Sequence, residues 1–413
     1  MDFSDSPADA RYRSEVRAWL DANAPRHLDE ALRRTAFAAM PDIANVIDES
    51  RAWQARKAAA GWACLHWPKK YGGREATPIE RMIWEQEEGI YAALTLIFLT
   101  GIGDCAPTLM EYAAEEQKLR LLPPMASGAE IWCQLFSEPA AGSDLAGVRT
   151  RAVREGDAWV VNGQKIWTSA AHVAAYGLLI ARTDPRVPKH KGLTAFFLDM
   201  KSPGVTVRPV RQAGGQSGFN EVFFDDVRIA DEQRLGAVGE GWKVAITTLM
   251  HERVAGGTGA PTGVPEFLAL VRSLQTPGGR AIEDPAVRER LADWAVRHNG
   301  LKFTAMRTAT ALAKNRMPGP EGGIGKLVFA PLAKDVAQLA LDLQGEAGVL
   351  TDPALAAAQG HFQALLMRSL GYSIEAGTDE ILRNTIAERV LGLPPDIRVD
   401  KDIPFDQVPA GPR

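Results

Sequence analysis

The segment most suited to chemistry is residues 137–144, which read Ser-Glu-Pro-Ala-Ala-Gly-Ser-Asp. Its small residues, hydroxyl side chains and turn-setting proline let backbone N–H groups and side-chain oxygens approach a flat polar ligand closely. A run of alternating polarity follows at 157–169, and Asn162-Gly163 within it predicts a hairpin turn. Composition alone favours a simpler alternative, in which the segment is a surface loop followed by a hairpin.

Two linked motifs, SEPAAGSDLAG and NGQKIWTS, resemble the flavin-binding signature of the acyl-CoA dehydrogenase family. That signature is Thr or Ser, Glu-Pro, a small-residue run with Ser-Asp, and then Trp-x-Thr/Ser. The resemblance covers roughly residues 10–395. It implies an FAD-dependent oxidoreductase that removes hydrogens from Cα and Cβ of an acyl-CoA thioester, forms a trans-2-enoyl-CoA and passes electrons to an electron-transfer flavoprotein in β-oxidation of a fatty acid or side chain.

That reaction needs a base for the Cα proton, a flavin N5 to take hydride from Cβ, and donors for the thioester oxygen. In the family the base is a glutamate, found just before Gly-Thr near the C-terminus or, in a minority of members, on a mid-chain helix before Arg. Here Ala376 precedes Gly377-Thr378 and cannot take a proton, whereas Glu252-Arg253 matches the minority. The resemblance therefore implies Glu252 as the base, which we expect in an apolar, water-poor pocket.

Other roles remain open for these carboxylates. Glu375 is the rival base, because it lies one residue from the usual position in a loop that could shift. Glu252 could instead be a solvated helix residue paired with an arginine. Arg253 could orient the CoA chain, brace the base, or form a plain salt bridge. His251 projects about 100° away from Glu252 on a helix, so we assign it no role.

The resemblance also implies the contacts to FAD and substrate. Residues expected at the cofactor are Gln134, Phe136, Ser137, Ser143, Trp167, Ser169, Thr378 and Glu380, and those expected at the substrate are Ser143, Arg253, Ala376 and Gly377. Ser137 and backbone groups would bond the isoalloxazine edge, Trp167 would cover the ring, and Ser169 would bond its N5 side. Thr378 and Glu380 would hold the pyrophosphate or adenosine end. A core aromatic is the alternative for Trp167.

Two segments depart from the family pattern. The region 272–280 lacks the usual Arg-Lys/Gln-x-Phe-Gly, and 342–348 reads Asp-Leu-Gln-Gly-Glu-Ala-Gly, with a carboxylate in place of the leading amide. Both changes resemble a bacterial branch that acts on bulky CoA esters, sometimes as mixed-subunit complexes. A homotetramer, a homodimer or a hetero-oligomer is therefore expected. Two alternatives are a flavin-deficient, non-catalytic partner subunit and an oxygen-using flavin enzyme on the same fold.

The elements that must position these residues follow an α–β–α order. Helical patterns occupy 42–60, 78–98 and 115–126 after an opening helix that Ser6-Pro7 caps, and short alternating runs fill 158–227. Longer helical patterns return at 291–315, 325–345 and 353–372. We expect an α+β fold of the acyl-CoA dehydrogenase type: an all-α domain at 1–130, a β-barrel or sandwich at 131–238, a four-helix bundle at 239–395 and an irregular tail at 396–413.

The composition and net charge of the chain exclude several classes of binding partner. The 413 residues carry a net charge of −4 and no basic runs, which argues against nucleic acid or an anionic membrane as the main partner. The three cysteines are too few and scattered for a disulfide framework, and neither they nor the histidines have metal-ligand spacing. No window has the apolar length of a membrane span, and the polar first residues disfavour a signal peptide. We therefore expect no metal, no membrane insertion and a cytoplasmic location.

Overall fold

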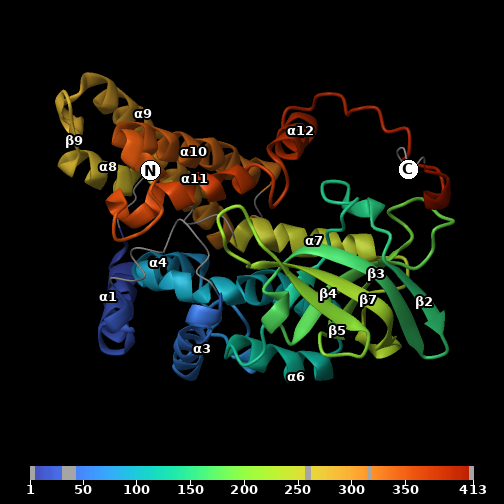
Figure 1. The fold of residues 1–413 in the computed structure, drawn as a ribbon. Helices are drawn as coiled ribbons and strands as arrows, with labels where there is room; N and C mark the ends of the chain where they lie inside the picture. The colour runs from blue at the N-terminus through green and yellow to red at the C-terminus, as the bar shows by residue number, and fades with distance from the viewer. Residues whose placement is uncertain (1–4, 30–42, 256–261, 315, 317–318, 409–413) are drawn as a thin grey trace. The chain divides into compact units, whose positions relative to one another are not determined.

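The computed structural model describes residues 5–29, 43–255, 262–314, 316 and 319–408. The chain forms two compact units (Figure 1). The first comprises Met1–Pro41, Ala76–Ala93 and Gly256–Pro394, and the second comprises Asp42–Glu75, Leu94–Ala255 and Pro395–Arg413. The domain boundaries expected at 130 and 238 remain a prediction.

The second unit is built on a mixed eight-stranded sheet. Its strands are β1 (Trp132–Leu135), β2 (Arg151–Glu155), β3 (Ala158–Ser169), β4 (Tyr176–Arg182), β5 (Leu193–Asp199), β6 (Val205–Val210), β7 (Phe219–Ala230) and β8 (Arg234–Leu235). The order is β6-β7-β3-β2-β4-β5-β8, with β1 pairing in parallel with β4. The alternating runs expected between 158 and 227 are all strands, so this part of the prediction is confirmed.

The expected turn at Asn162-Gly163 is wrong. Strands β2 and β3 pair from Arg151↔Asn162 to Glu155↔Ala158, so the hairpin turns at 156–157 and β3 continues through Asn162. The pairing of β3 with β7 shifts register at this point. A Cβ on Gly163 would come within 2.5 Å of Thr150 Oγ1, so the glycine is required by a close approach inside the sheet and not by a turn.

Two apolar clusters lie on opposite faces of β4 and β5. Leu178 and Ile180 pack with α5 (Ala106–Tyr112), α6 (Glu115–Ala126) and α7 (Gly241–Ala255). Leu179 packs instead with residues of β3 and β7, as alternation along a strand requires. Figure 1 shows α7 running along the strands, in agreement with its contacts to β4 and β5. Helix α3 (Ile43–Ala59) and the π-helical segment η4 (Thr100–Cys105) complete this unit's main helices.

The first unit is helical. Its main helices are α1 (Pro7–Asn23), α4 (Pro78–Glu88), α8 (Val264–Ser273), α9 (Pro285–Ala313), α10 (Ile324–Gln344), α11 (His361–Tyr372) and α12 (Asp379–Arg389). Ser6 caps α1 as expected: its hydroxyl accepts from the Asp9 N–H, and the Asp9 carboxylate in turn accepts from the Ser6 N–H. Helix α11 begins at His361 and not at residue 353 as expected. The backbone of Gly360 is left-handed, with a φ of 79°, so a right-handed helix cannot continue through it.

The tail after Pro394 is irregular, as expected, apart from the short η12 (Phe405–Gln407). It nevertheless docks on the sheet of its own unit. The Phe405 N–H donates to Val187 O at 3.0 Å, and the buried Phe405 ring lies 3.8 Å from the Arg182 guanidinium carbon. The tail is therefore part of the second unit's fold.

Among the described residues, no single helix combines the length and hydropathy of a membrane span. One bent pair, Pro78–Phe98 with Thr100–Tyr112, meets that criterion jointly.

Candidate active site

A buried ion pair joins the loop at 136–138 to strand β3. The Nζ of Lys165 lies 2.8 Å from Oε1 of Glu138 and donates to the Phe136 carbonyl at 2.9 Å. The Ile166 N–H donates to the Ser137 carbonyl at 2.9 Å. Three contacts thus fix the first motif, Ser-Glu-Pro, against the second, Lys-Ile-Trp-Thr-Ser. The sequence places these motifs nearly 30 residues apart, and the structure brings them together.

Glu138 is held as a carboxylate. Burial alone would raise its pKa, but the Lys165 charge and hydrogen bond, together with the backbone N–H of Arg149 at 2.6 Å, outweigh burial and lower it. The Arg149 N–H donates to Oε2 of Glu138, and the Thr150 N–H donates to Oε1, the oxygen that Lys165 also contacts, at 2.9 Å. The glutamate of the motif therefore has a structural task, which is to hold the loop in place.

Trp167 is turned outward. The residue is 56% exposed, its φ is +60°, and the β3–β7 register shifts between Lys165 and Thr168. The ring meets Phe219 edge-on with centroids 6.0 Å apart. The alternative that Trp167 is a core aromatic is therefore wrong. A left-handed backbone that exposes a large aromatic side chain fits a residue that covers a flat ligand.

Two buried polar atoms beside this junction lack partners. Gln134 Nε2 and Thr168 Oγ1 make no hydrogen bond to any described residue. Burying such groups unpaired costs roughly 1–3 kcal/mol each, so a polar ligand that bonded them would gain that much. This donor set fits the amide-like edge of a flavin. Thr168 was not among the expected contacts, although it lies inside the Trp-Thr-Ser motif.

The other expected cofactor residues of this unit surround the junction with differing exposure. Phe136 is buried, Ser137 and Ser169 are partly buried, and Ser143 is exposed. Asp144, next to Ser143, accepts from Lys189 at 2.9 Å, and Lys189 also bonds Asp400 of the tail at 2.7 Å. The loop is thus fixed at both ends, by Lys165 and by Lys189.

Glu252 lies in the last turn of α7 and is partly buried. Helix α7 packs along η4, where the carboxyl of Asp104 is buried. Burial, reinforced by the negative charge of Glu252, raises the pKa of Asp104 to about 9. No motif or spacing in the sequence pointed to Asp104. The side chain of Arg253 lies outside the described residues, so its role stays a prediction.

The C-terminal motif lies in the first unit. Both carboxylate oxygens of Glu375 accept from Nη2 of Arg368, at 2.7 and 2.8 Å. Ala376 and Gly377 are both left-handed, with φ of 51° and 84°, and Lys326 Nζ donates to the carbonyls of Glu375 and Gly377. These contacts form a tight, braced turn ahead of α12.

Two expected phosphate or adenosine contacts follow this turn. Thr378 caps α12 by accepting from the Ile381 N–H at 3.2 Å, and Glu380 is exposed in the first turn. A Thr side chain already committed to the cap retains its hydroxyl proton as a donor.

The two departing segments have defined structures. Strands β9 (Gln275–Thr276) and β10 (Gly279–Arg280) form a two-stranded hairpin where the family motif is missing. At the end of α10, Asp342 accepts from Gln338 at 3.0 Å. Gln344 Oε1 is buried with no partner among the described residues. That acceptor is a candidate contact for a donor on an incoming ligand or chain.

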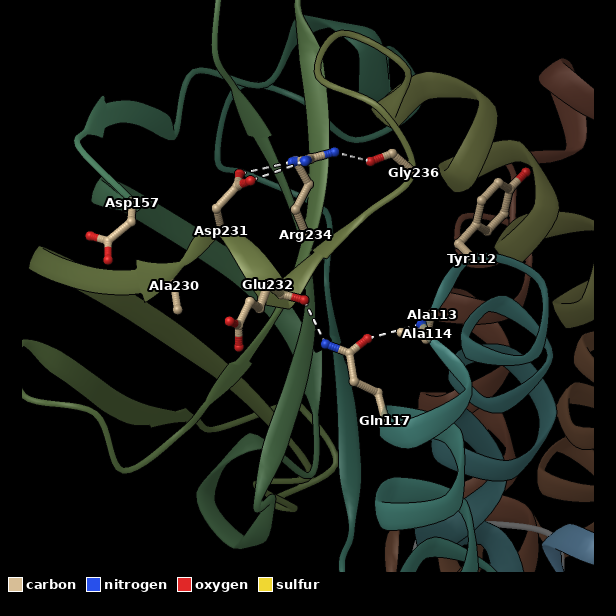
Figure 2. A pocket seen from close by; sticks show the side chains of 10 residues that line it. All are labelled: Tyr112, Ala113, Ala114, Gln117, Asp157, Ala230, Asp231, Glu232, Arg234 and Gly236. Atoms are coloured by element: carbon tan, nitrogen blue, oxygen red, sulfur yellow. Dashed lines mark hydrogen bonds and ion pairs between the residues drawn. The ribbon is translucent and has the colours of Figure 1, made fainter.

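A cavity in the second unit lies apart from these residues. It is lined by Tyr112, Ala113, Ala114, Gln117, Asp157, Ala230, Asp231, Glu232, Arg234 and Gly236, and none of the expected site residues is among them (Figure 2). Its polar groups already bond one another: the Arg234 side chain pairs with Asp231 at 2.9 Å, and the Gln117 side chain donates to the backbone carbonyl of Glu232 at 2.6 Å. This cavity is not the candidate active site.

Helical segments before and after a β-domain in sequence, with a flavin-type loop fixed to a strand, define the class of acyl-CoA dehydrogenases. Family models match almost the whole chain: "Acyl-CoA dehydrogenase, N-terminal domain" at residues 6–129, "middle domain" at 133–227 and "C-terminal domain" at 239–391. The chain belongs to the acyl-CoA dehydrogenase family and is an oxidoreductase, as its sequence predicted.

Curated relatives support the same family assignment. Acyl-CoA dehydrogenase IpdE1 of Mycolicibacterium smegmatis is 38% identical over 409 residues, covering 94% of this chain and 98% of the relative. Acyl-CoA dehydrogenase FadE34 of Mycobacterium tuberculosis is 38% identical over 365 residues, covering 88% of this chain but 49% of FadE34. The chain therefore spans about half the length of FadE34 and nearly all of IpdE1.

Solved structures share the fold. The ChsE4-ChsE5 complex from Mycobacterium tuberculosis is 31% identical with a TM-score of 0.80, covering 96% of this chain and 100% of that chain. A structure titled "Tcur3481-Tcur3483 steroid ACAD" is 28% identical with a TM-score of 0.82 and the same coverage. The expected α+β architecture is confirmed.

Proposed function

We propose that this protein is an FAD-dependent acyl-CoA dehydrogenase that converts an acyl-CoA thioester to a trans-2-enoyl-CoA. The observation that carries the proposal is the fixed junction of the 136–138 loop with β3. It presents the exposed Trp167 beside the unpartnered polar atoms of Gln134 and Thr168. A non-catalytic partner subunit that had lost its flavin would have no need to keep these features.

FAD, when bound, supplies the two-electron acceptor for the hydride that leaves Cβ. Gln134, Ser137, Thr168 and Ser169 hold its polar edge, and Trp167 covers the ring and excludes water. Thr378 and Glu380 are proposed to hold the phosphate or adenosine end, with Thr378 donating its hydroxyl proton. Ser143 is proposed to contact the substrate, and Ala376 and Gly377 are proposed, each on its own, as further substrate contacts.

Glu252 is proposed as the base. It takes the Cα proton, and the electron pair of the broken Cα–H bond, whose developing charge the thioester carbonyl shares, forms the Cα=Cβ double bond as the hydride departs from Cβ. Glu252 is favoured because Ala376, at the family's usual base position, has no acidic side chain, whereas Glu252-Arg253 matches the alternative position. Both oxygens of the rival Glu375 are engaged by Arg368, an ion pair that would have to open before Glu375 could accept a proton.

The substrate is proposed to be the CoA ester of a bulky, ring-bearing acyl group. The structural relative at 28% identity is titled a steroid enzyme, and the two departing segments resemble the branch that acts on bulky esters. Electrons are proposed to pass to an electron-transfer flavoprotein. The structural relative named as the ChsE4-ChsE5 complex, and the Tcur3481-Tcur3483 relative whose name joins two proteins, support assembly of this chain with a further chain.

The test is an anaerobic titration of the purified yellow protein. A panel of linear, branched and ring-bearing CoA esters is added, and bleaching of the flavin absorption is followed. We expect the ring-bearing ester to bleach it fastest, Glu252→Gln to keep its flavin but lose bleaching, and Glu375→Gln to bleach at a rate within a few-fold of wild type. A protein that stays colourless after soaking with FAD would support the non-catalytic subunit instead.

Two further measurements complete the test. Oxygen consumption during turnover, compared with reduction of an electron-transfer flavoprotein, separates a dehydrogenase from an oxygen-using enzyme. Light scattering of the chain alone gives its assembly state.

A further inference from the structure

The Ser143 loop, residues 136–150 between β1 and β2, is held near its middle by Lys189 of the connection between β4 and β5. Lys189 Nζ donates to both carboxylate oxygens of Asp144, at 2.9 Å each. The same Nζ lies 2.7 Å from a carboxylate oxygen of Asp400 in the C-terminal tail. The Lys189 side chain is 10% exposed, so one nearly buried cation joins the Ser143 loop to the tail.

Arg182 makes a second connection between the tail and this loop. Its guanidinium donates to the backbone carbonyls of Ala146 and Val148, near the end of the Ser143 loop. Arg182 is buried and makes no ion pair with a described residue. On the tail side it meets the Phe405 ring, whose centroid lies 3.8 Å from the guanidinium carbon, and a desolvated cation is attracted to such an aromatic face. The tail thus reaches the loop through two cations.

The path of the tail follows these polar contacts and not apolar burial. Ile397 and Val399, which precede Asp400, are both exposed. The Asp400 side chain, in contrast, is only 29% exposed. Apolar side chains left in solvent beside a carboxylate that is drawn in reverse the usual pattern of burial. The contact of Asp400 with Lys189 therefore sets the course of this part of the tail.

We propose that the tail fixes the Ser143 loop for substrate binding, with Asp400 as a positioning residue that acts through Lys189. This inference rests on the proposed role of Ser143 at the substrate. Asp144 is 59% exposed, and an exposed ion pair between flexible side chains restricts them little. Asp400 on the other side of Nζ confines the ammonium to one place, which in turn confines Asp144 and the adjoining Ser143. A loop ordered in advance loses less conformational entropy when the substrate binds.

The first test needs no substrate and measures hydrogen exchange in peptides that cover residues 141–148. The Gly147 N–H donates to the Asp144 carbonyl at 2.8 Å inside the loop, so its exchange reports local opening. Asp400→Ala is expected to quicken this exchange about tenfold. Asp402→Ala is the matched control, because it removes an exposed carboxylate from the same tail and should leave the exchange unchanged. Equal exchange in the two variants would overturn the proposal.

A double-mutant cycle tests the route through Lys189. Lys189→Met removes the cation that joins loop and tail, so adding Asp400→Ala to it should change the exchange by less than about twofold. If Asp400→Ala instead has its full effect in the Lys189→Met background, Asp400 does not act through Lys189 and the proposal fails.

The functional test follows anaerobic flavin reduction at increasing concentrations of the CoA ester that bleaches wild type fastest. Asp400→Ala is expected to raise the half-saturating ester concentration about tenfold, because the loosened loop must be ordered by the ester itself. The rate at saturation should stay within about threefold of wild type, since Glu252 is untouched. Asp402→Ala should alter neither value.

Two outcomes separate this inference from the proposed function. If exchange quickens in Asp400→Ala but the half-saturating concentration is that of wild type, the tail only stabilises the loop and Asp400 has no positioning role. If no CoA ester reduces the flavin of wild type, the proposed function itself is wrong, and the exchange rates alone then decide whether the tail holds the loop.

Discussion

Lys165 and Glu138 form a buried ion pair 2.8 Å long that ties the loop of the first motif to the strand of the second. Lys165 is fully buried, and its second bond goes to the Phe136 carbonyl. Because residues on both sides of this pair are proposed to hold FAD, the pair links the stability of the β-domain to its cofactor site.

Lys165→Met should therefore destabilise the protein and release FAD together. Removing one partner leaves Glu138 buried and uncompensated, which costs about 3–5 kcal/mol. Urea unfolding and flavin content measure the two effects. Arg228→Met is the control, since its ion pair with Glu155 on the same sheet is exposed and should cost less than about 1 kcal/mol. Equal losses in the two variants would contradict the assignment.

Trp167→Gly should separate stability from cofactor binding. Glycine relieves the left-handed backbone but adds freedom to the unfolded chain, so the stability of the flavin-free protein should change by less than about 1 kcal/mol. Loss of the exposed ring should weaken FAD binding about tenfold. Fluorescence titration with FAD gives the affinity. Val153→Ala, at another exposed apolar side chain of the sheet, should change neither property. Unchanged FAD affinity in Trp167→Gly would remove Trp167 from the site.

Asp104→Asn should become more stable relative to wild type as pH rises. The pKa of Asp104 is about 9 in the folded protein, against about 3.9 for an unfolded chain. Between these values the folded state holds a proton that the unfolded state releases, so wild type loses stability with rising pH, by at most about 1.4 kcal/mol per pH unit. Asparagine does not titrate. Urea unfolding at pH 5, 7 and 9 measures the difference, and a gap that stays constant would show that Asp104 is ionised throughout.

Phe405→Ala should loosen the tail from the β-domain. The buried ring rests on Arg182, and its removal should lower the local docking free energy by about 3 kcal/mol. The N–H of Phe405 and of Asp406 donate to backbone carbonyls of the β-domain, so their hydrogen exchange should quicken about 100-fold. Ile397→Ala, at an exposed position of the same tail, is the control. Exchange that is equally slow in both variants would mean that the backbone bonds alone hold the tail.

Local patterns in the sequence were enough to predict much of the fold. Ser6-Pro7 caps the first helix, the alternating runs form strands, and the long helical patterns at 291–315 and 325–345 correspond to α9 and α10. These features follow from bonds between near neighbours in the chain and from the side chains that face a core, both of which leave a regular period in the sequence.

Two local predictions failed for the same reason. Asn162-Gly163 has the composition of a turn, yet Gly163 is needed where Thr150 comes too close for a side chain. The helical pattern from 353 is interrupted at Gly360, whose left-handed backbone starts α11 later. In both cases glycine can adopt several conformations. A tertiary contact or backbone strain then determined which of them it adopts.

The sequence by itself determined the family, through two linked motifs, and pointed to Glu252 as the proposed base, with Glu375 as its rival, because Ala376 stands where the usual glutamate would be. The tertiary structure decided which groups surround these residues. It buried Lys165 against Glu138, exposed Trp167 on a left-handed backbone, and buried the carboxyl of Asp104 where the charge of Glu252 reaches it. Such neighbours are separated by tens to more than a hundred residues, and burial sets their charge, so no local pattern records them.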